Sequence, residues 1–248
     1  MRPVPLWILI YQLWSIQRIH RSVEKIVIGL ALISLGSILL IINKFAQRGE
    51  TPTFYFAIAG VFFILGYLSY AVSFLESGTD SSSTSFNLGN TMAQKAGYIL
   101  IWVVLVAFTF FSLSHIVGAL PAGSWLSWEL AIYFTFLLLL VIAAFYYYFT
   151  SHKVDPLLNF ASILALVGSL VALASDNLMA HYYLYNSWHT GIVCVFYLVT
   201  FYLGEFLIGK SAIKTAAFFQ KTTVWLWLNI NMQINLFTKN IEIIEKRK

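Results

Sequence analysis

The chain is poor in charge and almost free of cysteine. Of its 248 residues, 10% are charged and a single one, Cys194, is a cysteine. A soluble domain normally carries about 25% charged residues, so too few remain here to cover a water-facing surface. One cysteine excludes an internal disulfide and a thiolate metal cluster. These scarcities exclude an ordinary cytosolic enzyme, a disordered chain and a fibrous repeat.

Apolar residues are abundant instead, and they make up 60% of the sequence. They gather in runs of about 17–25 residues, the length that a helix needs to cross the hydrocarbon of a bilayer. Six runs predict membrane spans: Ile26–Ile42, Phe54–Leu75, Ala96–Leu120, Trp125–Phe149, Leu157–Leu173 and Trp188–Ile208. The predicted fold is therefore an all-α integral membrane protein, a bundle of six transmembrane helices.

The two ends of the sequence differ from these runs. Residues 1–24 hold Trp7, Trp14 and a basic end, which predicts an amphipathic helix at the membrane interface. Residues 25–209 form the predicted transmembrane bundle. Residues 210–248 alternate apolar and polar side chains between Leu228 and Leu236, a period typical of a strand. We expect an interfacial or partner-contacting tail, with a seventh span as the alternative.

The basic residues predict an orientation. With six spans, nearly all of them fall on the N-terminal side, and the other side receives only Lys44 and Arg48. The positive-inside rule then places both termini in the cytoplasm. The net charge of +5 is explained by anionic lipid head groups, so we expect membrane lipids and no nucleic acid as partners.

This topology places five ionisable residues near the non-cytoplasmic face. They are His115, Glu129, Asp176, His181 and His189. Three histidines can hold a catalytic zinc ion that activates water, and Asp176 or Glu129 can serve as general base or orient a histidine. The alternative is that the histidines only meet water and head groups, beside the aromatic belt that membrane proteins have at this depth.

Short motifs at these residues resemble a family of membrane hydrolases. Ser175-Asp176-Asn177-Leu178, followed by Asn186-Ser187-Trp188-His189-Thr190-Gly191, resembles the end of the alkaline ceramidases and their adiponectin-receptor-like relatives, the CREST superfamily. Ser112-Leu113-Ser114-His115 resembles the serine-and-histidine helix of that family, and Trp128-Glu129-Leu130 resembles its acidic segment. The resemblance implies a hydrolase that cleaves an amide in a lipid, with zinc held by three histidines and Ser112 among the catalytic residues.

Two other classes of function stay open. His115 and His189 lie at similar depth on different predicted helices, so they could bind haem or chlorophyll in a subunit of an electron-transfer or photosynthetic complex. A non-catalytic scaffold subunit would use the C-terminal tail to contact a protein partner. A transporter is less favoured, because the middles of the predicted spans hold almost no ionisable residue. The first prediction is a metal-dependent lipid amide hydrolase at the non-cytoplasmic face.

Overall fold

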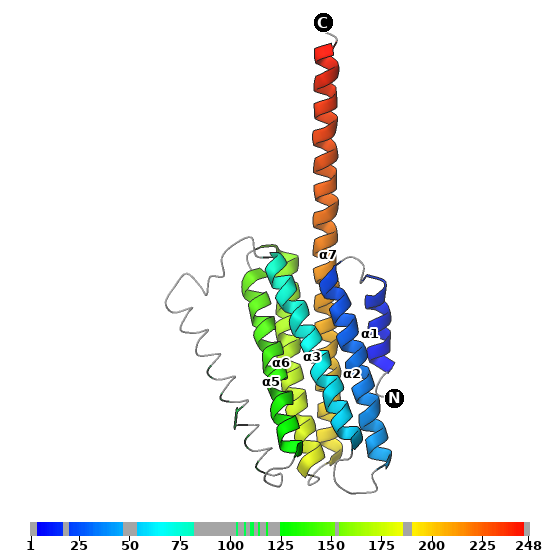
Figure 1. Ribbon diagram of the computed structural model, residues 1–248, viewed down its shortest axis with the longest axis vertical. Coiled ribbons are helices and arrows are strands. Elements are labelled where there is room, and N and C mark those ends of the chain that lie inside the picture. Colours follow the sequence, from blue (N-terminus) through cyan, green and yellow to red (C-terminus); the bar gives the residue numbers. More distant parts are fainter. Residues whose placement is uncertain are drawn as a thin grey trace.

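The chain forms a bundle of long helices, shown by the computed structural model in Figure 1. The structure describes residues 4–16, 20–46, 54–81, 125–151, 154–185 and 190–245, with isolated positions between 103 and 118. The helices in these ranges are α1 (Val4–Trp14), α2 (Arg21–Ala46), α3 (Phe54–Ser81), α5 (Trp125–Ser151), α6 (Pro156–Tyr185) and α7 (Thr190–Glu245). These described ranges contain no strand, and the all-α prediction is confirmed.

Five helices in the described part of the chain hold an apolar segment long enough to cross a membrane. The segments are Arg21–Ile42, Tyr55–Asp80, Ser127–Ser151, Pro156–Ala180 and Val195–Val224. They overlap five of the six predicted spans. The remaining predicted span, Ala96–Leu120, lies outside the described residues apart from isolated positions. The prediction of a helical membrane protein with several spans is therefore confirmed.

The directions of the helices define two ends of the bundle. α3 and α5 are parallel, because Gly60 lies against Glu129 near their starts and Gly78 approaches Thr150 near their ends. α2 and α3 run in opposite directions, so α3 ends where α2 begins (Figure 1). α5 begins at the other end, together with α3. α7 continues past the bundle at the end where α2 begins. We call this end the projecting end and the other the opposite end.

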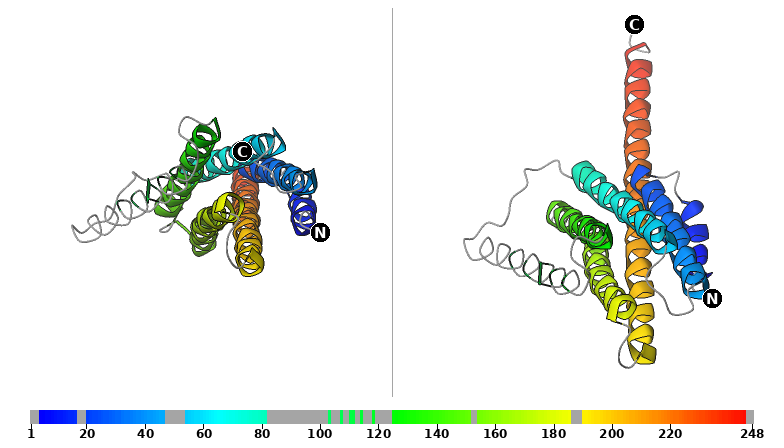
Figure 2. Two further views of the ribbon diagram at one scale, coloured as in Figure 1. Left: turned by 90° about the horizontal axis from the view of Figure 1, so that it is seen from below. Right: turned by 60° about the horizontal axis from the view of Figure 1, so that its bottom comes forward.

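The helices pack around a core, in which α7 contacts both α6 and α2 (Figure 2). The contact between α6 and α7 depends on small residues. A Cβ atom added at Gly204 of α7 would lie 3.1 Å from the backbone nitrogen of Ala172 and 3.2 Å from the carbonyl oxygen of Gly168. Membrane helices associate largely through such close backbone packing, since the lipid around them is as apolar as their side chains.

Replacing this glycine tests the close contact. We expect Gly204→Val to force α6 and α7 apart and to cost about 1–3 kcal/mol of stability, as overpacking generally does. The measurement is the thermal unfolding midpoint of the purified protein in detergent. Leu203→Val is the matched control, because Leu203 is the neighbouring residue and is 45% exposed. Equal midpoints for the two variants would contradict the role assigned to Gly204.

The N-terminal helix α1 packs on the outside of the bundle, against α2 and α7. It buries Leu6, Leu9 and Leu13 and exposes Trp7 and Trp14. Its 11 residues extend about 16 Å, roughly half the thickness of the hydrocarbon core. The structure confirms a short apolar helix at the N-terminus. Its place at the membrane interface and the cytoplasmic location of the termini stay predictions.

The last helix, α7, has 56 residues and runs far beyond the bundle (Figure 1). At 1.5 Å per residue it is about 84 Å long, against about 30 Å of hydrocarbon. The strand predicted for Leu228–Leu236 is wrong, because this segment is helical. The sequence from Lys210 to Glu245 has neither glycine nor proline, so nothing ends the helix that leaves the bundle. A separate seventh span would need a turn, and α7 has none.

An ion pair and a contact between a histidine and a carboxylate connect α3 to the start of α2 at the projecting end. The Nζ atom of Lys25 lies 2.6 Å from Oε2 of Glu76, and Nε2 of His20 lies 3.1 Å from Oδ2 of Asp80. The His20 ring stacks on Phe219 of α7 with 3.9 Å between ring centroids. Burial lowers the pKa of His20 below its usual 6.5, although the contact with Asp80 acts in the opposite direction.

This shift predicts a loss of stability in acid. Because the pKa of His20 is lower in the folded protein, the unfolded chain takes up the proton more readily, and the contribution of His20 is lost as the pH falls below about 6.5. We expect His20→Gln to lose less thermal stability than the unmodified protein between pH 8 and pH 5. The difference between the two unfolding midpoints measures the effect, and a difference that is constant with pH would contradict it.

Candidate functional site

Asp176 of α6 lies wholly buried inside the bundle, with 0% of it exposed. Two tyrosine hydroxyl groups donate to its Oδ2 atom, one from Tyr67 of α3 at 2.5 Å and one from Tyr133 of α5 at 2.7 Å. Three helices thus meet at one carboxyl oxygen. Such donors replace part of the hydration that a carboxyl group loses on burial.

A second carboxyl group, that of Glu205 on α7, is equally buried. The hydroxyl of Tyr70, one turn after Tyr67 on α3, donates to its Oε2 atom at 2.6 Å. The Tyr70 ring lies against Gly29 of α2, at a position where a Cβ atom would collide with it. Asp176 and Glu205 are close enough to interact electrostatically. We call these two residues the carboxyl pair.

The carboxyl pair has no cationic partner among the residues that the structure describes. The second oxygen of each group, Oδ1 of Asp176 and Oε1 of Glu205, is buried without a hydrogen-bond partner there. A buried ionisable group without a counter-ion costs stability, and in membrane helices such groups usually mark a functional site. The pair is therefore the strongest candidate for a functional site within the described ranges.

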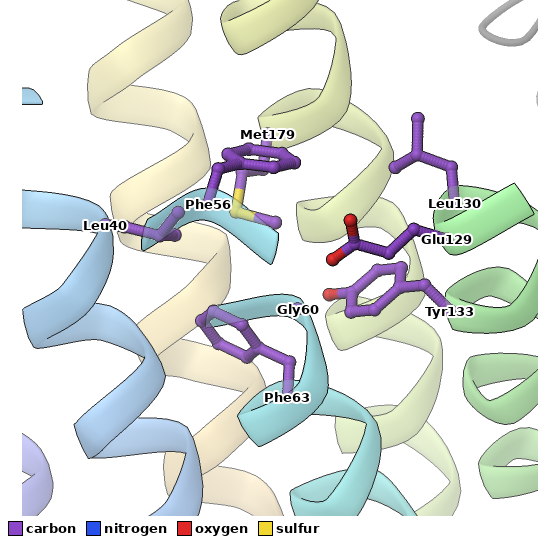
Figure 3. Close-up of a pocket in the computed structure, with 8 residues that line it drawn as sticks. All are labelled: Leu40, Phe56, Gly60, Phe63, Glu129, Leu130, Tyr133 and Met179. Atoms are coloured by element: carbon purple, nitrogen blue, oxygen red, sulfur yellow. The ribbon is translucent and has the colours of Figure 1, made fainter. Parts of the chain in front are cut away.

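A cavity lies beside Tyr133, near the opposite end of the bundle, where α3 and α5 begin. Figure 3 shows the residues that line it. The cavity is partly open and contains about 320 Å³ of empty space, counting its mouth. Its lining is Leu40, Phe56, Gly60, Phe63, Glu129, Leu130, Tyr133 and Met179. Both carboxyl oxygens of Glu129 are buried and have no hydrogen-bond partner among the described residues. Tyr133 connects this cavity to Asp176, because it lines the first and donates to the second.

Two of the predicted site residues, Asp176 and Glu129, can be placed. Tyr133 donates a hydrogen bond to Asp176 and lines the same cavity as Glu129. Both residues lie near the opposite end, which is the predicted non-cytoplasmic face. Ser112, His115 and His189 lie outside the described residues, and His181 is described only as part of the helix α6. Their convergence with Asp176 and Glu129 therefore stays a prediction.

The motif around Asp176 separates into two roles. Asp176 faces the tyrosines, whereas the side chain of Asn177 donates to the carbonyl oxygen of Leu173 in its own helix at 2.8 Å. The hydroxyl of Ser175 donates to the backbone oxygen of Tyr197 on α7 at 3.4 Å. Of these three residues, Asp176 alone places its side chain in the candidate site.

Glu205 is a buried ionisable residue that was not predicted as part of a site. The predicted sixth span ended at Ile208, which put Glu205 near a membrane surface. The apolar segment of α7 extends instead over Val195–Val224, and Glu205 lies in its interior. The statement that the span centres hold almost no ionisable residue is therefore wrong at this position. An acidic residue inside an apolar run was the signal that could have found it.

The residues described in the structure do not form the predicted zinc site by themselves. No group of three histidine, cysteine, aspartate or glutamate side chains clusters among them. The Oδ2 atom of Asp176 accepts two hydroxyl groups, so its Oδ1 atom alone remains for another partner. The side chains of the histidines predicted as ligands lie outside the part of the chain that the structure describes.

Removing the charge of the pair tests whether it serves stability. We expect the double variant Asp176→Asn, Glu205→Gln to unfold at the same temperature as the unmodified protein or at a higher one, because two buried groups lose their desolvation cost. Thermal unfolding in detergent checks this result. A structural role predicts the reverse, a clear fall in the unfolding midpoint.

The fold and the site define a class of protein: a membrane protein with several helical spans whose bundle encloses carboxyl groups held by tyrosine hydroxyls. The YhhN family model matches residues 1–212, which is most of the chain, and the chain belongs to the YhhN family. The match includes Glu129, Asp176 and Glu205, whereas the projecting part of α7 lies beyond it. No curated protein and no solved structure matches the chain.

Proposed function

We propose that the chain is a membrane hydrolase that cleaves a lipid, with Asp176 as its acid–base group and Glu205 as the partner carboxyl. The observation that carries this proposal is the carboxyl pair itself, buried without a described counter-ion and joined through Tyr133 to an apolar cavity. Hydrolysis needs a group that gives a proton to the leaving atom and a group that takes one from water.

The pair can divide these two tasks. Two carboxyl groups near each other in an apolar interior are not readily charged together, so one holds a proton while the other is free to accept one. The tyrosines keep the bound oxygens in place: Tyr67 and Tyr133 hold Asp176, and Tyr70 holds Glu205. The unpartnered oxygens Oδ1 of Asp176 and Oε1 of Glu205 are the atoms left for a substrate or a water molecule.

The cavity supports a lipid as the substrate. Its lining is apolar except for Glu129 and Tyr133. The enclosed part of the cavity has room for about one water molecule, so it would hold the water for hydrolysis, while the lipid linkage would approach through the open side. Glu129 lies in the second turn of α5, next to the start of the membrane-length segment at Ser127, which is the depth of lipid head groups.

The catalytic test uses a panel of lipids with amide, ester and ether linkages, because the linkage is not identified. The purified protein is incubated with each lipid, and the products are measured by mass spectrometry. We expect Asp176→Asn and Glu205→Gln each to lower the rate by about 10²-fold or more, the usual contribution of acid–base catalysis.

Ser169→Ala is the matched control for these variants, since Ser169 is a buried residue of α6 whose hydroxyl binds only its own helix, at Ala165. Full activity in the double variant Asp176→Asn, Glu205→Gln would overturn the proposal. Activity confined to amide-linked lipids would support the resemblance to the alkaline ceramidases, which stays a prediction.

The zinc predicted at His115, His181 and His189 is a separate proposal. When bound there, zinc would supply an activated water molecule. Metal analysis combined with an absorption spectrum tests it. We expect zinc to be lost in His115→Ala and His189→Ala, whereas a haem or chlorophyll spectrum that disappears in the same variants would favour the electron-transfer or photosynthetic alternative. Purification in a fixed complex held by residues 210–248, without any need for the carboxyl pair, would favour a scaffold subunit.

A further inference from the structure

Glu129 is a buried carboxyl group that the proposed acid–base chemistry does not use. It lies near the start of α5, at the opposite end of the bundle, and its carboxyl group packs against Gly60 of α3. Both of its oxygens are buried and have no hydrogen-bond partner among the described residues. Burial of such a carboxyl group costs free energy, and in membrane helices residues of this kind usually mark a functional site.

The cavity joins Glu129 to the tyrosine that holds Asp176. Figure 3 shows the Glu129 carboxyl group and the Tyr133 hydroxyl group pointing into the same space. The space has room for about one water molecule, so a proton can pass between the two groups through water. The Tyr133 hydroxyl then donates to Oδ2 of Asp176 at 2.7 Å.

The line of polar groups from Glu129 through Tyr133 reaches Asp176 near the opposite end. Tyr67 shares the Oδ2 atom of Asp176, and its ring lies 6.3 Å, centroid to centroid, from that of Tyr70. Tyr70 donates to Glu205 at 2.6 Å. Glu205 is thus held beyond the end of the line, close enough to interact electrostatically with Asp176.

Towards the projecting end, the line meets an aromatic layer. Phe74, one turn beyond Tyr70 on α3, stacks on Tyr147 of α5 with 6.0 Å between ring centroids and 12° between ring planes. Both side chains are almost fully buried. The Tyr147 hydroxyl is occupied by Thr215 of α7, at 2.7 Å. Protons from water at the projecting end would have to cross this layer.

We infer that Asp176 of the carboxyl pair exchanges protons with water at the opposite end of the bundle, through Glu129 and Tyr133. This inference rests on the proposed function, because the route would supply protons to the proposed catalytic site. That site would then respond to the pH on one side of the membrane. In the transfer, Glu129 gives a proton to the water molecule in the cavity, that water gives one to the Tyr133 oxygen, and Tyr133 gives its own to Oδ2 of Asp176. Glu129 is left as a carboxylate and takes a new proton from outside.

The groups that face this route are few. Asp176 is faced by Tyr67 from α3, Tyr133 from α5 and Glu205 from α7. Tyr133 is itself faced by Tyr197 from α7. Glu205 is faced by Tyr70 from α3 and by Asp176. Glu129 has no ion-pair partner within the described ranges. No described cation therefore competes with proton transfer along the line.

The test follows protonation directly and needs no substrate. The protein is reconstituted in vesicles, and those with the projecting part of α7 outside are selected by protease accessibility. The infrared carbonyl band of protonated Asp176, assigned by its loss in Asp176→Asn, is followed after a pH step on either side. We expect a fast response to a step inside, at the Glu129 end, and a slow response to a step outside.

Variants of Glu129 identify the route. We expect Glu129→Gln and Tyr133→Phe to slow the response to the inner step several-fold, and Glu129→Asp to restore most of it because it keeps a group that carries a proton. Glu24→Gln is the matched control, since Glu24 is an exposed carboxyl group at the projecting end.

An unchanged response in Glu129→Gln, or a faster response to the outer step, would overturn the inference. Because the measurement follows protonation of Asp176 and not turnover of a substrate, failure of the hydrolase proposal in the lipid panel leaves this result independent. A one-sided response with no hydrolysis would retain the proton route and reject the enzyme.

Discussion

The structure depends on one constraint, the need of a carboxyl group in an apolar bundle for hydrogen-bond donors from other helices. α3 meets this need for both members of the carboxyl pair, because Tyr67 and Tyr70 are one turn apart and reach α6 and α7 respectively. The rotation of α3 is therefore fixed by two hydrogen bonds to two partner helices. Gly29 of α2 completes the arrangement by leaving room for the Tyr70 ring.

Cohesion of the bundle and chemistry of the site are carried by different residues. Small residues such as Gly168, Ala172 and Gly204 bring α6 and α7 into backbone contact, and apolar side chains fill the rest of the core. The hydrogen bonds to the carboxyl groups orient α3, but burial of these groups costs stability, so small and apolar residues hold the helices together. The protein has few charged residues, yet the carboxyl groups of Asp176, Glu205 and Glu129 are buried. Stability alone does not explain these positions.

The sequence predicted the class and part of the site for definite physical reasons. Apolar runs of membrane length are a strong signal, and sorting charges by side drew attention to Asp176 and Glu129. Glu205 escaped because the end of the sixth span was set too early at Ile208. The tyrosines were not predicted, because a hydrogen bond between two helices depends on the rotation of each helix about its axis. The spacing of apolar residues does not determine that rotation. The alternation in Leu228–Leu236 misled because it is local, whereas the helix before it continues without a breaker.

The length of α7 has a mechanical consequence. Glu205 and the far end of the helix belong to one rod, and the apolar segment ends at Val224 between them. At 1.5 Å per residue, the arm from Val224 inward to Glu205 is about 29 Å, and the arm outward to Glu245 is about 32 Å. Inside the bundle this rod is held by α6 at Gly204 and by Tyr147 of α5 at Thr215. A partner bound to the outer part would therefore act on the same continuous helix that carries Glu205.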